Sequence, residues 1–378
     1  MDYRFTKEQE ELHKRAKKLA DEKIAPLAPE VDESDEISME VVRIMAAENL
    51  YRYAIPDGYG GYGIKVMNLC IIREELSRVS VQADSTFAMQ GLGTYPISFA
   101  GSHEQKAKYL PPVASGARLA TFALTEPEAG SDVASMKTNA RLDGDFYILN
   151  GQKRFISQAP TAELYTVFAK TDPAQKGRGI SAFIVEKGMP GFDPGRKLTL
   201  IAAHCIGEPK FENCRVPREN IIGQPGGGMR IALSTLDVFR TSVGAACVGL
   251  AQAACDEALK YAKTRVAFGQ TLSEYQATQF KLADMATEIQ AARLLVFWAA
   301  TLKDGGQERV IKEASMAKLF ASEVAGRAAD QAVQIHGRMG IIKGVPIERI
   351  YRECRAPRIY EGTSEIQRLT ISRELLRS

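Results

Sequence analysis

The spacing of hydrophobic residues predicts helices in the first third of the chain. Thr6 and Gln9 have the spacing of a capping box, in which two side chains satisfy the free N–H groups at a helix start. Apolar residues three and four positions apart then mark one face of a helix. Such residues are Leu12, Ala16 and Leu19, then Val41, Ile44 and Met45 after a possible cap at Ser38, and a further run over residues 68–77.

From about residue 116 the pattern changes to short apolar runs of strand length. These runs cover residues 146–149, 164–169 and 180–185. The first is bracketed by the dipeptides Asp143-Gly144 and Asn150-Gly151, both of which favour hairpin turns. We therefore expect a small antiparallel β-barrel or sandwich over roughly residues 116–225.

Residues 225–228, Pro-Gly-Gly-Gly, favour a break in regular structure. The chain that follows is rich in alanine and is again predicted to be helical. Long amphipathic stretches cover residues 229–264, 273–302 and 308–337. The predicted fold class is mostly α with a β middle domain. The predicted domains are an N-terminal helical domain (1–115), the β-domain (116–225) and a C-terminal four-helix-type bundle (226–378).

Composition narrows the class of protein. The 378 residues are 45% hydrophobic and carry a net charge of +3, which argues against a dedicated nucleic-acid binder. The N-terminus, residues 1–5, lacks a signal-peptide core, and no apolar run of about 18 residues predicts a membrane span. The six cysteines form neither a CxxC pair nor a metal-ligand cluster, so we expect buried free thiols, no metal and a cytoplasmic protein.

Near the C-terminus, a carboxylate stands directly before a predicted helix in the run Tyr360-Glu361-Gly362-Thr363-Ser364-Glu365. Glycine allows close approach of a ligand to the backbone, and the hydroxyls and first-turn N–H groups suit a polar ligand.

In the β-region, Leu124-Thr125-Glu126-Pro127 follows a strand and precedes Gly130-Ser131. Strand ends and hydroxyls can hydrogen-bond a planar polar ring. A strand-to-loop turn with caps is the alternative. Downstream, Phe155 and Ser157 end a run that starts at Asn150, and a core aromatic residue is the alternative for Phe155.

Three further segments lie in the helical C-terminal part. Asp237 and Arg240 share a helix face, where a simple ion pair is the alternative to ligand binding. The run Arg265-Val266-Ala267-Phe268-Gly269-Gln270 places a cation and an aromatic residue beside a glycine that ends one helix and starts a turn. Residues 334–340 end another helix with two glycines and could receive a nucleotide diphosphate. His336 within them is expected to pack or to support other polar groups.

These segments, in this order, resemble the acyl-CoA dehydrogenase family over essentially the whole chain. The resemblance implies FAD as cofactor and removal of the α-proton of an acyl-CoA by Glu361. Residues implied to contact FAD are Phe122, Leu124, Thr125, Gly130, Ser131, Phe155, Ser157, Arg265, Phe268, Gln276, Gln334, Gly337, Arg338, Thr363 and Glu365. Residues implied to contact the substrate are Ser131, Leu236, Asp237, Arg240, Tyr360 and Gly362.

The resemblance also implies a homotetramer built as a dimer of dimers and an electron-transfer flavoprotein as electron acceptor. Three departures from the family pattern bear on these expectations. Phe155 stands where the family commonly has tryptophan, Arg338 stands where it has a second glycine, and residues 201–209 lack its Gly-x-Arg-x-Ser segment. The last departure affects the choice of electron acceptor. His204 beside Cys205 invites a catalytic interpretation, but a nucleophile needs a separately placed base.

The acyl group is left open by the sequence. Residues 84–96 match the stretch that lines the acyl pocket in the family, and they contain no arginine for a second carboxylate. Asp84 could assist a polar or cyclic acyl group, although a solvated loop carboxylate is the expectation. The expected reaction is dehydrogenation to a 2-enoyl-CoA. The alternatives are an enoyl-CoA reductase on the same fold and a non-catalytic flavin-binding relative. A flavin is expected rather than a nicotinamide because no Gly-x-Gly-x-x-Gly run follows a strand.

Overall fold

The computed structural model describes residues 5–377, so the first four residues, on which the expectation of no signal peptide partly rests, lie outside the described residues. The chain divides into two compact units. Unit 1 comprises the residues up to Asp32, Val66–Asp84 and the residues from Asp237 onward, and unit 2 comprises Glu33–Lys65 and Ser85–Leu236. The division into three sequence domains stays a prediction.

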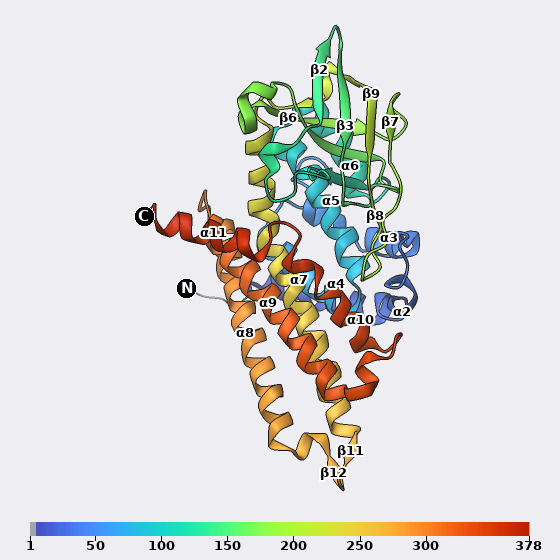
Figure 1. The fold of residues 1–378 in the computed structure, drawn as a ribbon, viewed down its shortest axis with the longest axis vertical. Coiled ribbons are helices and arrows are strands. Elements are labelled where there is room, and N and C mark those ends of the chain that lie inside the picture. The colour runs from blue at the N-terminus through green and yellow to red at the C-terminus, as the bar shows by residue number, and fades with distance from the viewer. Residues whose placement is uncertain (1–4, 378) are drawn as a thin grey trace. The chain divides into compact units, whose positions relative to one another are not determined.

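Unit 2 contains an eight-stranded sheet with the strand order β10-β6-β5-β2-β3-β9-β7 and with β1 paired to β5 (Figure 1). The bounds are β1 Ala120–Ala123, β2 Asn139–Asp143, β3 Phe146–Gln152, β5 Leu164–Lys170, β6 Ile180–Glu186, β7 Phe192–Asp193, β9 Lys210–Pro217 and β10 Ile221–Ile222. The short strands β4 (Ile156–Ser157) and β8 (Ile206–Gly207) pair separately. The predicted β-domain is therefore confirmed. Most pairings are antiparallel, but β1–β5 and β2–β5 are parallel, which the apolar pattern did not indicate.

One predicted turn is wrong. The turn at Asp143-Gly144 joins β2 to β3 as expected, with Gly144 at a φ of +59°. Asn150-Gly151, however, lies inside β3, where the register against β9 shifts in a bulge. A Cβ at Gly151 would lie 2.5 Å from the hydroxyl of Thr138, so close packing against another chain segment requires this glycine.

The core of unit 2 forms where helices cover the sheet. Phe168 of β5 and Ile184 of β6 are fully buried in one cluster with Ile97 and Leu110. The helices of this unit are α3 (Met39–Ala47), α5 (Val81–Ala100, whose first four residues belong to unit 1) and α6 (His103–Ala114). Residues 84–96 are thus helical rather than a loop.

Unit 1 is helical apart from a small hairpin. Its helices are α1 (Lys7–Leu19), α2 (Ala28–Val31), α4 (Val66–Val79), most of α7 (Gly228–Thr264), α8 (Gln276–Asp304), α9 (Ile311–His336), α10 (Pro346–Glu353) and α11 (Ser364–Leu375). The capping box of Thr6 and Gln9 at the start of α1 is confirmed.

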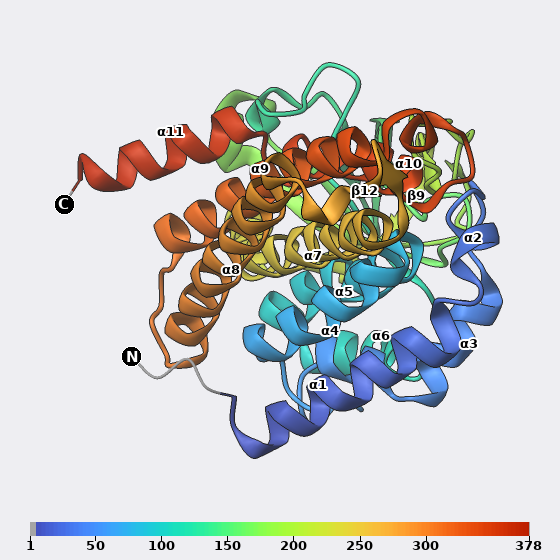
Figure 2. The same cartoon turned by 90° about the horizontal axis from the view of Figure 1, so that it is seen from below.

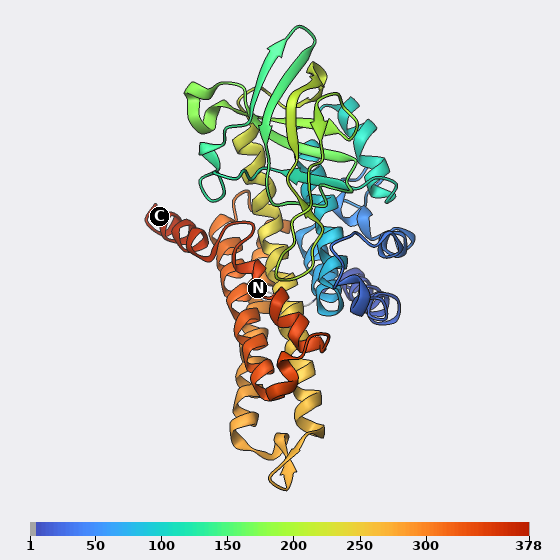
Figure 3. The same cartoon turned by 45° about the vertical axis from the view of Figure 1, so that its right-hand side comes forward.

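Small residues let the long helices of unit 1 approach closely. A Cβ at Gly244 of α7 would lie 2.8 Å from Val296 of α8 and 3.4 Å from the backbone of Ala317 of α9. Figure 2 shows α7, α8 and α9 side by side. The hairpin of β11 (Val266–Ala267) and β12 (Gln270–Thr271) connects α7 to α8 and projects beyond their ends (Figure 3). Gly269 therefore lies in a turn, as expected, but α7 already ends at Thr264, so the expectation that this glycine ends a helix is wrong.

One helix among the described residues, α7, is long and apolar enough to cross a membrane by length and composition. Its sequence is interrupted by polar residues and is not an unbroken apolar run, so it does not contradict the expectation drawn from the sequence. Some 78% of its most apolar window is buried within the protein, as in the core helix of a globular protein. This is weak evidence for a span.

Candidate active site

Glu361 lies in a strained turn directly before the last helix. Its backbone has a φ of +52°, a region that non-glycine residues seldom occupy, and Gly362 follows at +94°. Thr363 then caps α11, its hydroxyl accepting a hydrogen bond from the N–H of Ile366 at 3.3 Å. The predicted place of Glu361, at the mouth of a helix, is confirmed.

Three side chains hold the two carbonyl groups of this turn. Arg240 Nε donates to the carbonyl oxygen of Glu361 at 3.2 Å, and the buried Lys318 Nζ donates to that of Gly362 at 2.7 Å. Gln367 Nε2 reaches both oxygens, at 3.1 and 3.0 Å. Since hydrogen bonds from charged groups are strong, the backbone that carries Glu361 has a fixed conformation.

The carboxyl group of Glu361, in contrast, has a free oxygen. Its Oε2 is buried and has no hydrogen-bond partner. Burial raises the pKa of Glu361, against the opposing effect of the Arg73, Lys318 and Arg240 side chains. Within residues 5–377 the N–H of Glu361 likewise meets no acceptor. A buried orphan carboxylate oxygen beside an unused N–H donor is an arrangement that suits proton transfer next to a polarised group.

A buried ion pair of Arg73 and Asp84 contributes to the charges around Glu361. Arg73 Nε and Nη2 each donate to one oxygen of Asp84 at 2.8 Å, and Nη1 donates to Ser242 at 3.0 Å. Asp84 is only 4% exposed, so the expectation of a solvated loop carboxylate is wrong. The pair joins α4 to the first turn of α5, two helices whose contact no sequence spacing revealed.

Of the residues predicted to contact substrate, some already have protein partners and others are accessible. Arg240 lies 3.7 Å from Asp237, so the simple ion pair exists, and burial raises the pKa of Asp237. Tyr360 is 41% exposed next to Glu361. Leu236, also predicted to contact substrate, is the last residue of unit 2 and is half-buried.

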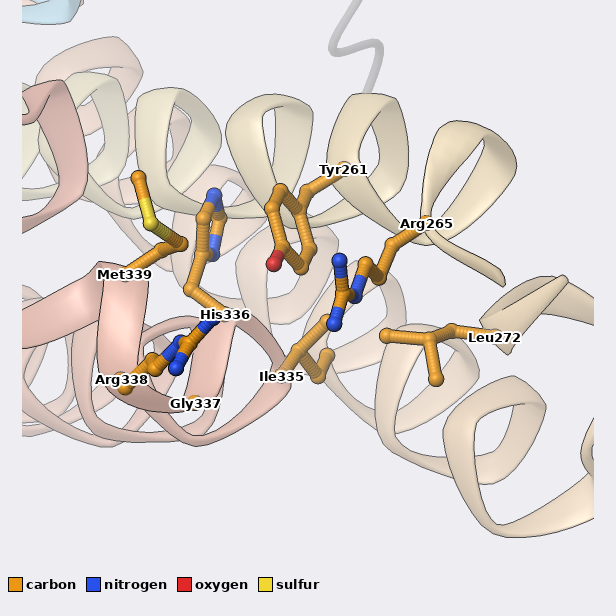
Figure 4. Close-up of a pocket in the computed structure, with 8 residues that line it drawn as sticks. All are labelled: Tyr261, Arg265, Leu272, Ile335, His336, Gly337, Arg338 and Met339. Atoms are coloured by element: carbon orange, nitrogen blue, oxygen red, sulfur yellow. The ribbon is translucent and has the colours of Figure 1, made fainter. Parts of the chain in front are cut away.

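A second site in unit 1 is a cavity of about 420 Å³ between the end of α7 and the end of α9 (Figure 4). The rings of Tyr261 and His336 stack at 4.3 Å, which confirms the packing role expected for His336. Arg265 and Arg338 supply two guanidinium groups, and Gly337 ends α9 with a φ of +58°. Stacked rings, two cations and an uncovered helix-end backbone can hold a nucleotide diphosphate.

Of the other predicted residues of this segment, none lines the cavity. Phe268 is fully exposed at the hairpin tip, and Gln276 and Gln334 are exposed on helix surfaces. The structure therefore brings Arg265, Gly337 and Arg338 together but not these three.

In unit 2 a buried ion pair fixes the loop after β1. Lys153 Nζ donates to Glu126 at 2.8 Å and to the carbonyl oxygen of Leu124 at 3.1 Å. Burial lowers the pKa of Lys153 to about 8, although Glu126 opposes the shift. Glu126 also accepts the N–H groups of Lys137 and Thr138. The sequence analysis missed this pair, for which the only signal was the two charges in otherwise apolar strand-end segments.

The predicted flavin residues of unit 2 lie around this anchored loop. The N–H of Arg154 donates to the carbonyl oxygen of Thr125 at 2.9 Å. Leu124 is buried, Thr125 and Phe122 are half-buried, and Gly130 and Ser131 are exposed. The structure thus leaves several of these side chains or backbone groups accessible to a ligand.

Phe155 and Ser157 complete this part of unit 2. Phe155 is 51% exposed despite its size and has a φ of +58°. The Ser157 hydroxyl lies 2.9 Å from Nε2 of His204. Burial lowers the pKa of His204 to about 4, against the opposing charge of Asp35. Strain and an exposed aromatic ring are frequent at ligand sites, and an accessible ring beside a hydroxyl fits a flavin.

The buried, unpartnered carboxylate oxygen of Glu361 and the cavity lined by Arg265 and Arg338 are features expected of an enzyme that binds an anionic cofactor. The chain belongs to the acyl-CoA dehydrogenase family. Three family models match it: the N-terminal domain over residues 6–117, the middle domain over 121–214 and the C-terminal domain over 226–376. The family resemblance inferred from the motifs is therefore confirmed.

Known proteins resemble the chain along its full length. An acyl-CoA dehydrogenase of Bacillus subtilis is 44% identical over 375 residues, covering 98% of each chain. The caffeyl-CoA reductase-Etf complex subunit CarC of Acetobacterium woodii is 42% identical over 378 residues, covering 99% of each. The solved butyryl-CoA dehydrogenase of Megasphaera elsdenii is 37% identical, covers 100% of both chains and has a TM-score of 0.96.

The cofactor is FAD, as the family and a solved FAD complex of PigA indicate. That complex is 28% identical, covers 100% of both chains and has a TM-score of 0.94. Residues in each unit, taken separately, fit part of such a group: in unit 1 the cavity between α7 and α9 suits a diphosphate, and in unit 2 the exposed Phe155 ring suits an isoalloxazine. When bound, FAD supplies the acceptor of an electron pair that no amino-acid side chain can accept.

Proposed function

We propose that the protein oxidises an acyl-CoA thioester to the 2-enoyl-CoA, with Glu361 as the base. The observation that carries the proposal is the buried, unpartnered Oε2 of Glu361 on a turn whose carbonyl groups are held by Arg240, Lys318 and Gln367. The carbonyl oxygens of Glu361 and Gly362 are thus engaged in holding the turn, whereas this carboxylate oxygen and the Glu361 N–H are left for a ligand.

The chemistry requires both a base and a hydride acceptor. Glu361 would take the proton from the α-carbon, and bound FAD would supply the acceptor for the hydrogen that leaves the β-carbon with its electron pair. The free N–H of Glu361 suits donation to the thioester carbonyl, where negative charge develops as the α-proton leaves. Because the pKa of Glu361 is raised above its ordinary value, the carboxylate is a stronger base for removing the α-proton.

The remaining site assignments belong to this proposal. FAD contacts are assigned to Phe122, Leu124, Thr125, Gly130, Ser131, Phe155, Ser157, Arg265, Phe268, Gln276, Gln334, Gly337, Arg338, Thr363 and Glu365. Substrate contacts are assigned to Ser131, Leu236, Asp237, Arg240, Tyr360 and Gly362. Arg240 already donates through Nε to the Glu361 turn, so only its terminal nitrogens are available to a ligand.

The proposed electron partner is supported by a relative, and the proposed oligomeric state by one exposed side chain. The name of the CarC relative includes an Etf complex, which supports an electron-transfer flavoprotein as electron partner. The full exposure of Phe268 supports a homotetramer in which the hairpin tip reaches a neighbouring subunit. A cytoplasmic location fits the six buried free cysteines.

A second candidate is reduction of an enoyl-CoA, which is favoured by the reductase named among the relatives. The same Glu361 would then give a proton to the α-carbon. The two directions differ in which substrate reacts with which form of FAD.

Anaerobic titration tests both candidates. Oxidised holoenzyme is mixed with straight, branched and cyclic acyl-CoAs, and dithionite-reduced holoenzyme with the matching enoyl-CoAs, while the flavin absorbance is followed. Bleaching of the oxidised flavin by one acyl-CoA supports dehydrogenation. Reoxidation by an enoyl-CoA without bleaching by any acyl-CoA supports the reductase, and no response in either direction refutes both.

A further inference from the structure

His204 contacts a hydroxyl that the proposed function places beside FAD, and the sequence analysis gave this histidine no role. It lies in the segment 201–209, which lacks the Gly-x-Arg-x-Ser pattern expected from the family resemblance. The Ser157 hydroxyl and His204 Nε2 are 2.9 Å apart. Both residues belong to unit 2, so the pair is defined within one compact body.

The backbone on both sides of this contact is held. Strand β4 pairs antiparallel with β8, with Ser157 opposite Ile206, and the N–H of Gln158 donates to Cys205 at 2.7 Å. The Ser157 carbonyl oxygen accepts the Thr121 hydroxyl at 2.5 Å. These bonds fix where the Ser157 hydroxyl lies, but they leave the direction of its hydrogen undetermined.

The His204 end is anchored independently. Its backbone N–H donates to Asp35 at 3.2 Å, and the second oxygen of Asp35 accepts the Thr199 hydroxyl at 3.4 Å. Because burial holds the pKa of His204 near 4, the ring is neutral at physiological pH. A neutral imidazole carries one donor and one acceptor nitrogen, and either nitrogen can take either role. Across residues 5–377, Nδ1 of His204 meets no partner, so neither tautomer is locked.

A flavin ring changes its hydrogen-bonding character during the reaction. The ring-edge nitrogen that receives the hydride is an acceptor before the transfer and carries an N–H afterwards. A hydroxyl that faces this atom must therefore donate in one state and accept in the other. A serine hydroxyl can do both, provided that its remaining partner changes role with it.

We infer that His204 is a positioning residue that serves as a two-way hydrogen-bond partner for the Ser157 hydroxyl in the two redox states of FAD. With oxidised FAD, His204 Nε2–H donates to Ser157, whose O–H donates to the ring edge. With reduced FAD, the ring N–H donates to Ser157, whose O–H donates to His204 Nε2. Between these states Nε2 loses one proton to water and Nδ1 gains one from water, so the imidazole stays neutral.

The inference rests on the proposed place of Ser157 at the flavin, and its test needs no acyl-CoA. The midpoint potential and the dissociation constant of FAD are measured for holoenzyme carrying His204→Phe, Ser157→Ala or both substitutions. One neutral hydrogen bond changes relative affinity about 3- to 10-fold. A partner that supported Ser157 in one redox state alone would instead shift the potential by roughly 15 to 30 mV, at about 30 mV per tenfold, and such a shift would contradict the two-way role.

Because His204 supports Ser157 in both redox states, we expect His204→Phe to weaken the binding of oxidised and of reduced FAD alike, each about 3- to 10-fold, and to leave the midpoint potential nearly unchanged. In the Ser157→Ala background the same substitution should change neither affinity. His204→Gln, which keeps a donor and an acceptor, should restore both affinities. The matched control is His103→Phe, an exposed histidine of α6 bonded to Tyr59, which should change neither quantity. Equal effects of His204→Phe in both backgrounds, or no rescue by glutamine, would overturn the inference.

A second measurement keeps the inference testable if His204→Phe does not fold. In wild-type holoenzyme labelled with ¹⁵N-histidine, the ring-nitrogen signals of His204 are assigned by their loss in His204→Gln. Reduction with dithionite should exchange the protonated and unprotonated character of Nδ1 and Nε2. Unchanged nitrogen shifts on reduction overturn the inference, whereas failure of the acyl-CoA titration alone would refute only the proposed reaction.

Discussion

Lys318 Nζ lies 2.7 Å from the carbonyl oxygen of Gly362, so a buried cation of α9 holds the carbonyl group of the residue directly after the proposed base. Burial lowers the pKa of Lys318, although the Glu361 carboxylate is among the groups that oppose the shift. The lysine therefore has two effects on the base: it fixes its backbone and stabilises its negative charge. The predictions below separate these effects.

Glu361→Gln should remove proton transfer while keeping the shape of the turn. We expect turnover to fall about 100- to 10,000-fold, the usual contribution of a general base. The FAD content should stay at the wild-type level because the backbone contacts of Arg240, Lys318 and Gln367 remain. Steady-state rates and flavin absorbance measure both quantities. Glu308→Gln, at an exposed glutamate of the same unit, is the control, and near-normal turnover of the Glu361→Gln variant would exclude this residue as the base.

Lys318→Met should shift the pH profile of oxidation toward higher pH. The active base is the carboxylate, so kcat/KM rises as pH increases through the Glu361 pKa, which lies above its ordinary value because of burial. Removing the Lys318 charge removes one group that lowers this pKa, and the pKa therefore rises further. The profile is measured as kcat/KM against pH, with Lys312→Met on the same helix as control. A limb that moves to lower pH would contradict the electrostatic role.

Gly362→Ala should misplace the base. The residue would need a φ near +94°, and its Cβ would lie 2.6 Å from Gln367 Nε2, a side chain that holds the turn. We expect a stability loss of about 1 to 3 kcal/mol and a lower kcat. Gly344→Ala is the matched control, because its φ is +89° but nothing lies within 4 Å of the added Cβ. It should lose stability without loss of turnover, so an equal drop in kcat for both variants would count against the positional argument.

Lys153→Met should destabilise the protein by about 3 kcal/mol or more, since it leaves the buried Glu126 without its cation. Urea unfolding of the apoprotein measures the free energy. The double variant Glu126→Gln with Lys153→Met should recover part of the loss, because no unpaired charge remains. If the double variant were less stable by the sum of both single losses, the two side chains would not be coupled.

The sequence predicted the helices well because their signals are local. The capping box of α1 and the alanine-rich runs of α7, α8 and α9 depend on residues a few positions apart. The place of Glu361 before α11 could also be predicted, since Gly362 and Thr363 mark the helix start. The turn predicted at Asn150-Gly151 was wrong because its structure depends on a contact that is not local. The same dipeptide suits a turn or a bulge, and contact with the distant Thr138 decides between them.

The supporting polar pairs could not be predicted because their partners are far apart in sequence. Arg73 and Asp84 lie on different helices, Glu126 and Lys153 are 27 positions apart, and Ser157 and His204 are 47 apart. Each member has an ordinary alternative, as a surface charge or a turn residue. Asp84 is an example: its carboxylate was expected to be solvated, but it is buried against Arg73.

The left-handed backbone at Glu361 has a consequence for redesign of the protein. Because Arg240, Lys318 and Gln367 bind the carbonyl oxygens of Glu361 and Gly362, they oppose a shift of the main chain toward the substrate that a shorter acid would need. Glu361→Asp would retract the carboxylate by one methylene with no way to recover the distance. A carboxylate grafted elsewhere around the acyl group would in turn need its own clamped turn. Changing the regiochemistry of such an enzyme is therefore a problem of building a loop rather than of choosing a side chain.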